Sequence, residues 1–169
     1  QNGKLNRYKI RQREYAVSGV NFLEVKFKNN KGRTVKSRIE KSMMHSFFNR
    51  KEEIFLHYNT PYGHYRLEPK LLNSFKRITL VNSCERVTID FDLNFSLTNG
   101  ESLAMPDLGI VEVKQGKYNR NSKILEQLKQ QNIRPSGFSK YCMGISLLHQ
   151  DIKSNRFKST IMSIYKLSA

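Results

Sequence analysis

Basic side chains recur at every second position in several short stretches of this chain. In residues 6–16, four of them alternate with side chains such as Tyr8 and Ile10. Successive side chains of a β-strand point to opposite faces of the sheet, so this spacing predicts a strand with one cationic face. Residues 22–28, 33–39, 86–95 and 109–115 show a similar alternation of polar and apolar side chains, with at least one basic residue on the polar face. The basic residues concerned are Arg7, Lys9, Arg11, Arg13, Lys26, Lys28, Lys36, Arg38, Arg86 and Lys114.

The order of the patterns predicts an α+β fold in a single domain over residues 1–169. Asn29 and Gly32 lie in a polar stretch that predicts a hairpin turn, and residues 77–81 are expected to pair with residues 86–95 through Asn82 and Ser83. Helical periodicity predicts helices over residues 40–48, 51–58, 122–131, 140–149 and 157–167.

The net charge of this chain indicates that its positive excess must be compensated. Thirty Lys and Arg stand against fourteen Asp and Glu among 169 residues, which gives a formal charge of +16. A compact fold with such an excess repels itself unless an anion, an acidic partner or solvent compensates. Nucleic acid, an anionic membrane surface and polyanionic small molecules are the candidates.

The basic strand faces allow two interpretations. For one strand alone, the simpler is the solvated outer face of a half-buried antiparallel sheet. Five such strands favour a site for a polyanion, because like charges directly opposite one another destabilise a sheet. If the sheet closes, the cations point inward and the apolar faces point outward toward covering helices.

Carboxylates interrupt the basic faces. Glu24 and Glu112 each precede a lysine two positions further on, on the same face of their own strand, and Asp90 and Asp92 follow Arg86. Such a carboxylate is either the partner in a salt bridge or a ligand for Mg²⁺ or Mn²⁺, which prefer oxygen donors and bridge to phosphates. The sequence leaves both readings open.

Residues 134–141 run into an expected helix start at Ser139. A helix N-terminus offers free N–H groups to phosphate oxygens, and Ser139 and Lys140 would add a hydroxyl group and a charge. The alternative is that Ser139 is only an N-cap and Lys140 a surface lysine.

The cysteines and the hydropathy pattern bear on location. Cys84 and Cys142 form no metal or disulfide motif and are expected to be buried thiols, which favours a reducing, cytoplasmic compartment. The chain contains no run of about 18 apolar residues, the length that would span a membrane. It begins without Met, so an upstream or partner anchor that places it on the cytosolic face of a membrane stays open.

Six ordered blocks resemble a known family. They are RYKIRQREY at residues 7–15, FLEVK at 22–26, KGRTVKSR at 31–38, RVTID at 86–90, GIVEVK at 109–114 and RPSGFSKY at 134–141. Together they cover nearly the whole chain and resemble the VTC (vacuolar transporter chaperone) domain. The resemblance implies a triphosphate-tunnel fold, in which an antiparallel β-barrel with a basic interior binds phosphate chains and helices pack outside. The first tunnel strand of this fold is expected to precede Gln1.

The same resemblance implies an activity and a set of site residues. Members of the polymerase type use Mn²⁺ or Mg²⁺ to transfer the γ-phosphate of ATP to a growing polyphosphate chain. The implied metal-binding carboxylate is Glu112. The implied phosphate ligands are Arg11, Arg13, Lys26, Lys36 and Arg86, which we expect to act in catalysis, together with Ser139 and Lys140.

The other basic residues of the strand faces complete the expected site. Lys9, Lys28, Arg38 and Lys114 are expected to bind the substrate. Arg134 is expected to do the same, because this chain has Gly137 where the family usually has a basic residue.

Two further functions stay open beside the polymerase. One is a triphosphatase of the same fold, and the other is a non-catalytic module that binds polyphosphate or inositol phosphates. The expected partners are ATP, polyphosphate or triphosphate. RNA is disfavoured, because RNA-binding sheets display aromatic side chains on the binding face, whereas Tyr8, Phe27 and Phe91 fall opposite the cations.

Overall fold

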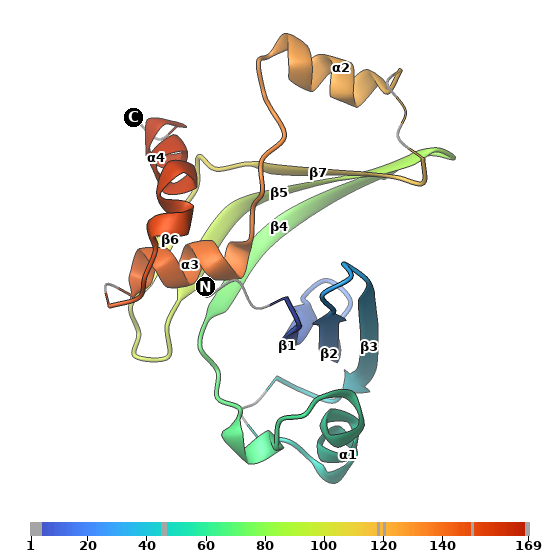
Figure 1. The fold of residues 1–169 in the computed structure, drawn as a ribbon, viewed down its shortest axis with the longest axis vertical. Helices are drawn as coiled ribbons and strands as arrows, with labels where there is room; N and C mark the ends of the chain where they lie inside the picture. The colour runs from blue at the N-terminus through green and yellow to red at the C-terminus, as the bar shows by residue number, and fades with distance from the viewer. Residues whose placement is uncertain (1–4, 45–46, 118, 120, 150, 168–169) are drawn as a thin grey trace. The chain divides into compact units, whose positions relative to one another are not determined.

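The computed structural model describes residues 5–44, 47–117, 119, 121–149 and 151–167, and these residues form helices together with antiparallel sheets (Figure 1). The chain divides into two compact units, Gln1–Pro69 and Lys70–Ala169. The α+β class is confirmed. Neither sheet closes on itself within the described residues, so the expected barrel is not confirmed.

The first unit contains a three-stranded antiparallel sheet in the order β1-β2-β3. At the β2–β3 turn, the side chain of Asn29 accepts a 2.8 Å hydrogen bond from the backbone of Arg33, and Gly32 adopts a φ of +80°, which a glycine tolerates. The predicted hairpin is therefore confirmed. The elements are β1 (Arg7–Tyr15), β2 (Val20–Lys28), β3 (Thr34–Lys41), α1 (Arg50–Asn59) and the short 3₁₀-helix η1 (His64–Arg66).

One face of this sheet packs against α1. Leu23 and Val25 of β2 are buried together with Leu56 of α1, and Ile10 of β1 and Ile39 of β3 pack around them. Burial of these apolar side chains stabilises the unit and leaves the opposite sheet face uncovered by this core.

The helix expected over residues 40–48 is wrong. Glu40 and Lys41 continue β3 and pair with β2, and α1 begins only at Arg50. Asn49 and Glu52 set this start through a capping box, in which each side chain bonds to the other residue's backbone N–H. Residues 45 and 46 lie outside the described part of the chain.

A buried ion pair joins β3 to α1. Lys41 Nζ lies 2.8 Å from Glu52 Oε2, and the two side chains are 0% and 1% exposed. Lys41 also donates to the carbonyl oxygen of Phe47 at 3.4 Å. Glu52 therefore both caps its helix and neutralises a lysine inside the unit.

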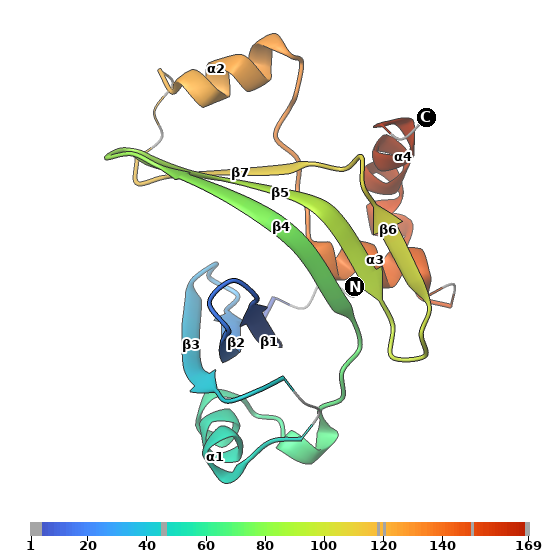
Figure 2. The same cartoon turned by 180° about the vertical axis from the view of Figure 1, so that it is seen from behind.

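The second unit contains a sheet in the order β4-β5-β6, and β7 pairs with β5 as well. Figure 2 shows β4 and β5 as long, curved strands. The strands are β4 (Leu72–Val81), β5 (Glu85–Ser96), β6 (Ser102–Met105) and β7 (Ile110–Gln115). The helices are α2 (Lys123–Gln130), α3 (Lys140–Leu148), the 3₁₀-helix η2 (Asn155–Phe157) and α4 (Lys158–Leu167).

An irregularity in the β4–β5 pair breaks the expected alternation of β5. The register shifts between Ser74 and Lys76 of β4, and Asp92 adopts a φ of +52°. Such a bulge places two successive residues on one side of the strand. Leu93 is buried against α3, and Asp90 contacts Lys140 of the same helix. Asp90 and Leu93 therefore lie on the same face of β5, although they are three positions apart. The predicted alternation holds only up to Phe91.

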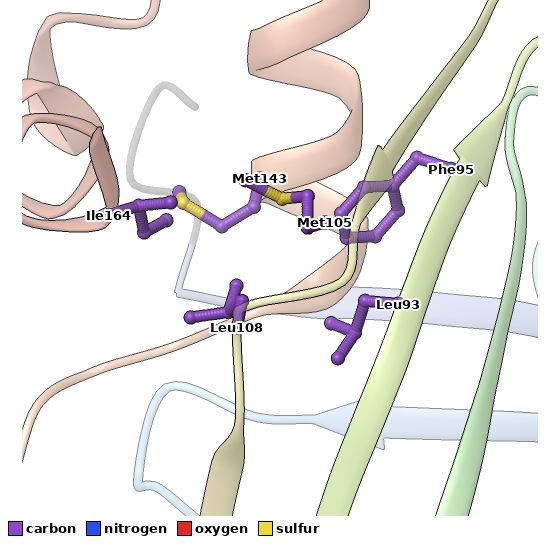
Figure 3. Close-up of a cluster of buried hydrophobic side chains, with 6 residues drawn as sticks. All are labelled: Leu93, Phe95, Met105, Leu108, Met143 and Ile164. Carbon is purple, nitrogen blue, oxygen red and sulfur yellow. The ribbon is translucent and has the colours of Figure 1, made fainter. Parts of the chain in front are cut away.

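The hydrophobic core of the second unit lies at the end of the sheet that carries β6. Figure 3 shows Leu93 and Phe95 of β5 close to Met105 of β6, Met143 of α3 and Ile164 of α4. The four-residue strand β6 was not predicted, because it is too short to show a period.

The two cysteines differ in their exposure to solvent. Cys84 is exposed in the β4–β5 turn, so its predicted burial is wrong; Cys142 of α3 is half-buried and packs on the core. Of the helices in the described residues, none has both the length and the apolar character required to cross a bilayer.

Candidate functional site

Three lysines lie side by side across the first sheet. Lys26 of the central strand β2 pairs directly with Lys9 of β1 on one side and with Lys36 of β3 on the other. Neighbouring strands are about 4.8 Å apart, and directly paired residues share a face. We call these three residues the lysine row; it lies on the face opposite the α1 core.

The lysine row raises the electrostatic free energy of the sheet. Burial, followed by the positive charges of Lys36, Arg11, Lys28 and Arg7, holds the pKa of Lys26 below its usual value. Like charges that face one another across strands destabilise a sheet. Lys9, Lys26 and Lys36 are exposed, so solvent as well as a bound anion can reduce this repulsion, and both readings of the face stay open.

The next row along the sheet contains two arginines with a carboxylate between them. Glu24 of β2 pairs with Arg11 of β1 and with Arg38 of β3. Its Oε2 accepts a hydrogen bond from Arg11 Nε and lies 3.9 Å from Arg13 Nε. Of the two readings of Glu24, the structure therefore supports the salt bridge.

Phe22 adds an aromatic side chain to the same face. It pairs with Arg13, and the guanidinium carbon of Arg38 lies 4.6 Å from the centre of its ring. Stacking on an aromatic ring fixes the plane of a guanidinium group. The sequence pattern predicted that the aromatic residues lie opposite the cations, but they do not all do so, because Phe22 lies among the cations.

The remaining predicted residue of this unit is Lys28, which pairs with Arg7 of β1. The unit thus brings seven of the predicted site residues onto one sheet face, which we call the cationic face. They are Lys9, Arg11 and Arg13 of β1, Lys26 and Lys28 of β2, and Lys36 and Arg38 of β3.

In the second unit, Arg86 and Lys114 lie side by side. They pair directly across β5 and β7, and Glu112 lies in the next row opposite Thr88. Lys114 Nζ is 3.3 Å from Glu112 Oε1, and the two side chains are more than half exposed. The expected metal-binding carboxylate is therefore accessible to solvent and already lies beside a cation.

A buried carboxylate binds Lys140. Asp90 Oδ2 accepts a hydrogen bond from Lys140 Nζ, and its two oxygens accept from Arg77 Nε at 2.5 Å and Arg77 Nη2 at 2.7 Å. Burial acts to raise the pKa of Asp90, but the hydrogen bonds and charges of Arg77 and Lys140 outweigh it and hold the pKa below its usual value. Lys140 is thus anchored to β5 at the start of α3.

The other two predicted residues of this unit lie around the same helix start. Ser139 is the N-cap of α3, and its hydroxyl oxygen accepts a 3.4 Å hydrogen bond from the backbone N–H of Cys142. Arg134 is exposed in the segment between α2 and α3. Ser139 therefore has the N-cap role that the sequence offered as one of two readings.

Comparison with known proteins decides the family. Residues 1–149 match the model of the VTC domain. The chain belongs to the VTC domain family. No curated protein and no solved structure matches it. The VTC domain connects the chain with polyphosphate in broad terms, and the sequence-based identification is confirmed.

Glu112 is the carboxylate of this VTC domain that the sequence assigned to a divalent metal ion. Within the described residues, no three His, Cys, Asp or Glu side chains come together at one place. Glu112 offers one exposed, hard oxygen donor. Mg²⁺ is commonly held by one or two carboxylates together with water and phosphate oxygens, so Glu112 fits such an ion in the presence of a phosphate substrate.

Sequence reasoning missed the pairing of Arg77 with Asp90 in this VTC domain. The signal was present in the hairpin: continuing the antiparallel register outward from Val81 and Arg86 brings Arg77 opposite Asp90. The contact of Lys140 with Asp90 joins residues 50 positions apart, and nothing in the sequence pattern indicated it.

We expect Asp90→Asn to lower the free energy of unfolding of this VTC domain by about 2 kcal/mol at pH 7, because charge-assisted hydrogen bonds contribute about 1.5–3 kcal/mol and the amide keeps part of them. The folded-state pKa lies below the unfolded value, so the contribution is present above the unfolded pKa and is lost as pH falls through the folded pKa.

Urea denaturation followed by circular dichroism at several pH values measures this difference. The difference between Asp90→Asn and the wild type should shrink toward acidic pH. A difference that is independent of pH would contradict the assigned role of the Asp90 charge. Asp107→Asn, on an exposed residue of the same unit, is the control.

Proposed function

We propose that this VTC domain is a polyphosphate polymerase that transfers the γ-phosphate of ATP to a growing polyphosphate chain. The observation that carries the proposal is the lysine row, in which Lys9, Lys26 and Lys36 face one another across three strands. A polyphosphate chain carries closely spaced negative charges along its length and would compensate several of these cations at once.

The proposed reaction demands little covalent chemistry from the protein. Phosphoryl transfer is catalysed mainly by positioning and by stabilising the charge that develops on the transferred group. Arg11, Lys26 and Lys36 extend from strands of one sheet, so their backbone positions are set before substrate binds. The acceptor is a phosphate oxygen that is already ionised at neutral pH, and no general base is required.

We propose that Glu112 holds the metal ion, Mn²⁺ or Mg²⁺. When bound, such an ion neutralises phosphate charge and stabilises the leaving diphosphate. The chain's own contribution is an exposed carboxylate on β7, with Lys114 3.3 Å away and Arg86 paired opposite Lys114. These basic side chains are proposed to bind phosphate oxygens.

We also propose that this VTC domain is located in the cytoplasm.

Incubation with ATP and Mn²⁺ followed by gel electrophoresis tests this function. Long phosphate chains are the expected product. Orthophosphate alone would indicate a triphosphatase, and binding of tripolyphosphate without turnover would indicate a binding module; each of these results would refute the polymerase.

Glu112→Gln tests the metal assignment in the same assay. We expect it to raise the Mn²⁺ concentration needed for half-maximal synthesis, while tripolyphosphate binding without metal is retained and does not weaken, because only a negative charge beside Lys114 is lost. Glu126→Gln, on an exposed position of α2, is the matched control. Equal loss of binding and turnover in Glu112→Gln would argue for a structural role of Glu112.

A further inference from the structure

A carboxylate lies in the middle of the cationic face. We propose that Glu24 is a positioning residue, which orients Arg11 and Arg13 toward the phosphate chain and keeps the affinity for that chain low enough for it to advance. The inference rests on the proposed function where it concerns chain synthesis; the effect of Glu24 on affinity is measured by binding alone.

The geometry places Glu24 between cations from both neighbouring strands. It extends from the central strand, with Arg11 paired on one side and Arg38 on the other. Its side chain is 15% exposed, whereas those of Arg11 and Arg13 are 42% and 23% exposed. The carboxylate is therefore more deeply placed than the guanidinium groups that it holds.

The contact with Arg11 uses one specific atom. Arg11 Nε donates to Glu24 Oε2. A guanidinium group carries four further N–H donors on its two Nη atoms. One on Nη2 points the same way as Nε–H, as in the pair of Arg77 with Asp90, and the other three point elsewhere. An arginine fixed in this way presents its Nη groups to a phosphate without first losing the rotamer freedom of a long side chain.

Arg13 is held from two directions. Its Nε lies 3.9 Å from Glu24 Oε2, and its Nη1 donates a 2.9 Å hydrogen bond to the hydroxyl oxygen of Tyr15. The ring of Tyr15 in turn packs edge-on against Phe22, with 6.0 Å between the ring centres. Glu24 is thus part of a network that fixes the directions of both arginines of β1.

The same carboxylate opposes the binding of an anion. A phosphate that binds Arg11 or Arg13 comes close to the negative charge of Glu24. One unit charge at about 4 Å in water changes an affinity by about fivefold. A polymerase must let its product move after each transfer, and a cationic face without this carboxylate would hold the chain more tightly.

Glu24→Gln tests the inference, because the amide keeps the size of the side chain and removes its charge. We expect the variant to bind tripolyphosphate, without nucleotide or metal, more tightly than the wild type in isothermal titration calorimetry. The gain should reach at most about fivefold, because the rotamer freedom that the arginines regain offsets part of it. The logarithm of its affinity should also fall more steeply with the logarithm of salt concentration. Its kcat for chain synthesis should fall about tenfold, because the arginines are no longer held in place.

Two further variants separate positioning from folding. Glu24→Asp keeps the charge and should restore the wild-type affinity. Glu14→Gln removes the same charge from an exposed position of β1, and its pairing with Asn21 places it on the other sheet face, so it should leave the affinity unchanged. Circular dichroism spectra that match the wild type would show that each variant is folded.

Unchanged or weaker tripolyphosphate binding by folded Glu24→Gln would overturn the inference, and so would tighter binding with unchanged kcat. These results differ from a failure of the proposed function, which would appear in the wild type as the absence of chain synthesis. A wild type that binds tripolyphosphate but makes no chains would overturn the part that concerns chain advance.

Discussion

Lys41→Met is expected to lower the free energy of unfolding by about 3–5 kcal/mol, because it leaves the carboxylate of Glu52 buried without the ammonium group 2.8 Å away. Both side chains are at most 1% exposed, so water cannot take the place of the lost partner. Methionine has a similar length, which limits the effect of a cavity. Urea denaturation followed by circular dichroism measures the change.

Two comparisons make this result specific to the ion pair. Lys51→Met changes an exposed lysine in the first turn of α1 and should shift the free energy of unfolding by less than about 0.5 kcal/mol. Lys41→Met combined with Glu52→Met should recover part of the loss, because no unpaired charge is then buried. If the double variant is instead less stable than Lys41→Met, Glu52 stabilises the protein mainly by accepting the hydrogen bond from the backbone N–H of Asn49 in the capping box.

Lys26→Met is expected to lower the rate of chain synthesis by about 10²–10³-fold while it stabilises the protein in the absence of substrate. The rate falls because a cation of the lysine row, set in position by β2, is lost. The stability rises, by about 0.2–1 kcal/mol, because directly paired like charges are removed from the sheet.

The pKa of Lys26 gives the sign of the stability change an independent check. Burial and the surrounding cations hold this pKa below its unfolded value, so the unfolded chain binds more protons in the alkaline range and stability rises with pH there. This alkaline rise should be smaller in Lys26→Met. Denaturation at several alkaline pH values measures it.

Lys31→Met is the matched control for Lys26→Met, because Lys31 is exposed in the turn between β2 and β3. It should change neither chain synthesis nor stability beyond about 0.5 kcal/mol. A Lys26→Met protein that is less stable than the wild type and retains its rate would show that the lysine row does not carry the function.

The sequence predicted most of the cationic face of the first unit because the information is local. Residues of one strand share a face when they are two positions apart, so the alternation from Arg7 to Arg13 was enough to place its basic residues together. The turn at Asn29 and Gly32 then fixed the register and brought Lys26 opposite Lys36. Hairpin geometry required no knowledge of distant contacts.

The start of α1 shows where local reasoning fails. Residues 40–48 have apolar side chains at helical spacing, yet Glu40 and Lys41 continue β3. Pairing with β2 and burial of Lys41 against Glu52 outweigh the helical propensity of this segment. The same holds for Asp92, whose bulge ends an alternation that the sequence shows as continuous.

The sequence by itself determined the family, the antiparallel strands and the cationic face of the first unit, because periodicity and ordered motifs are properties of neighbouring residues. The register of the β4–β5 hairpin already implied the pair of Asp90 with Arg77. Only the tertiary structure decided that Lys140 also neutralises Asp90 and that Lys41 neutralises Glu52. The physical reason is that an ion pair depends on a distance of a few ångströms between side chains, and these partners lie 11 to 50 positions apart along the chain.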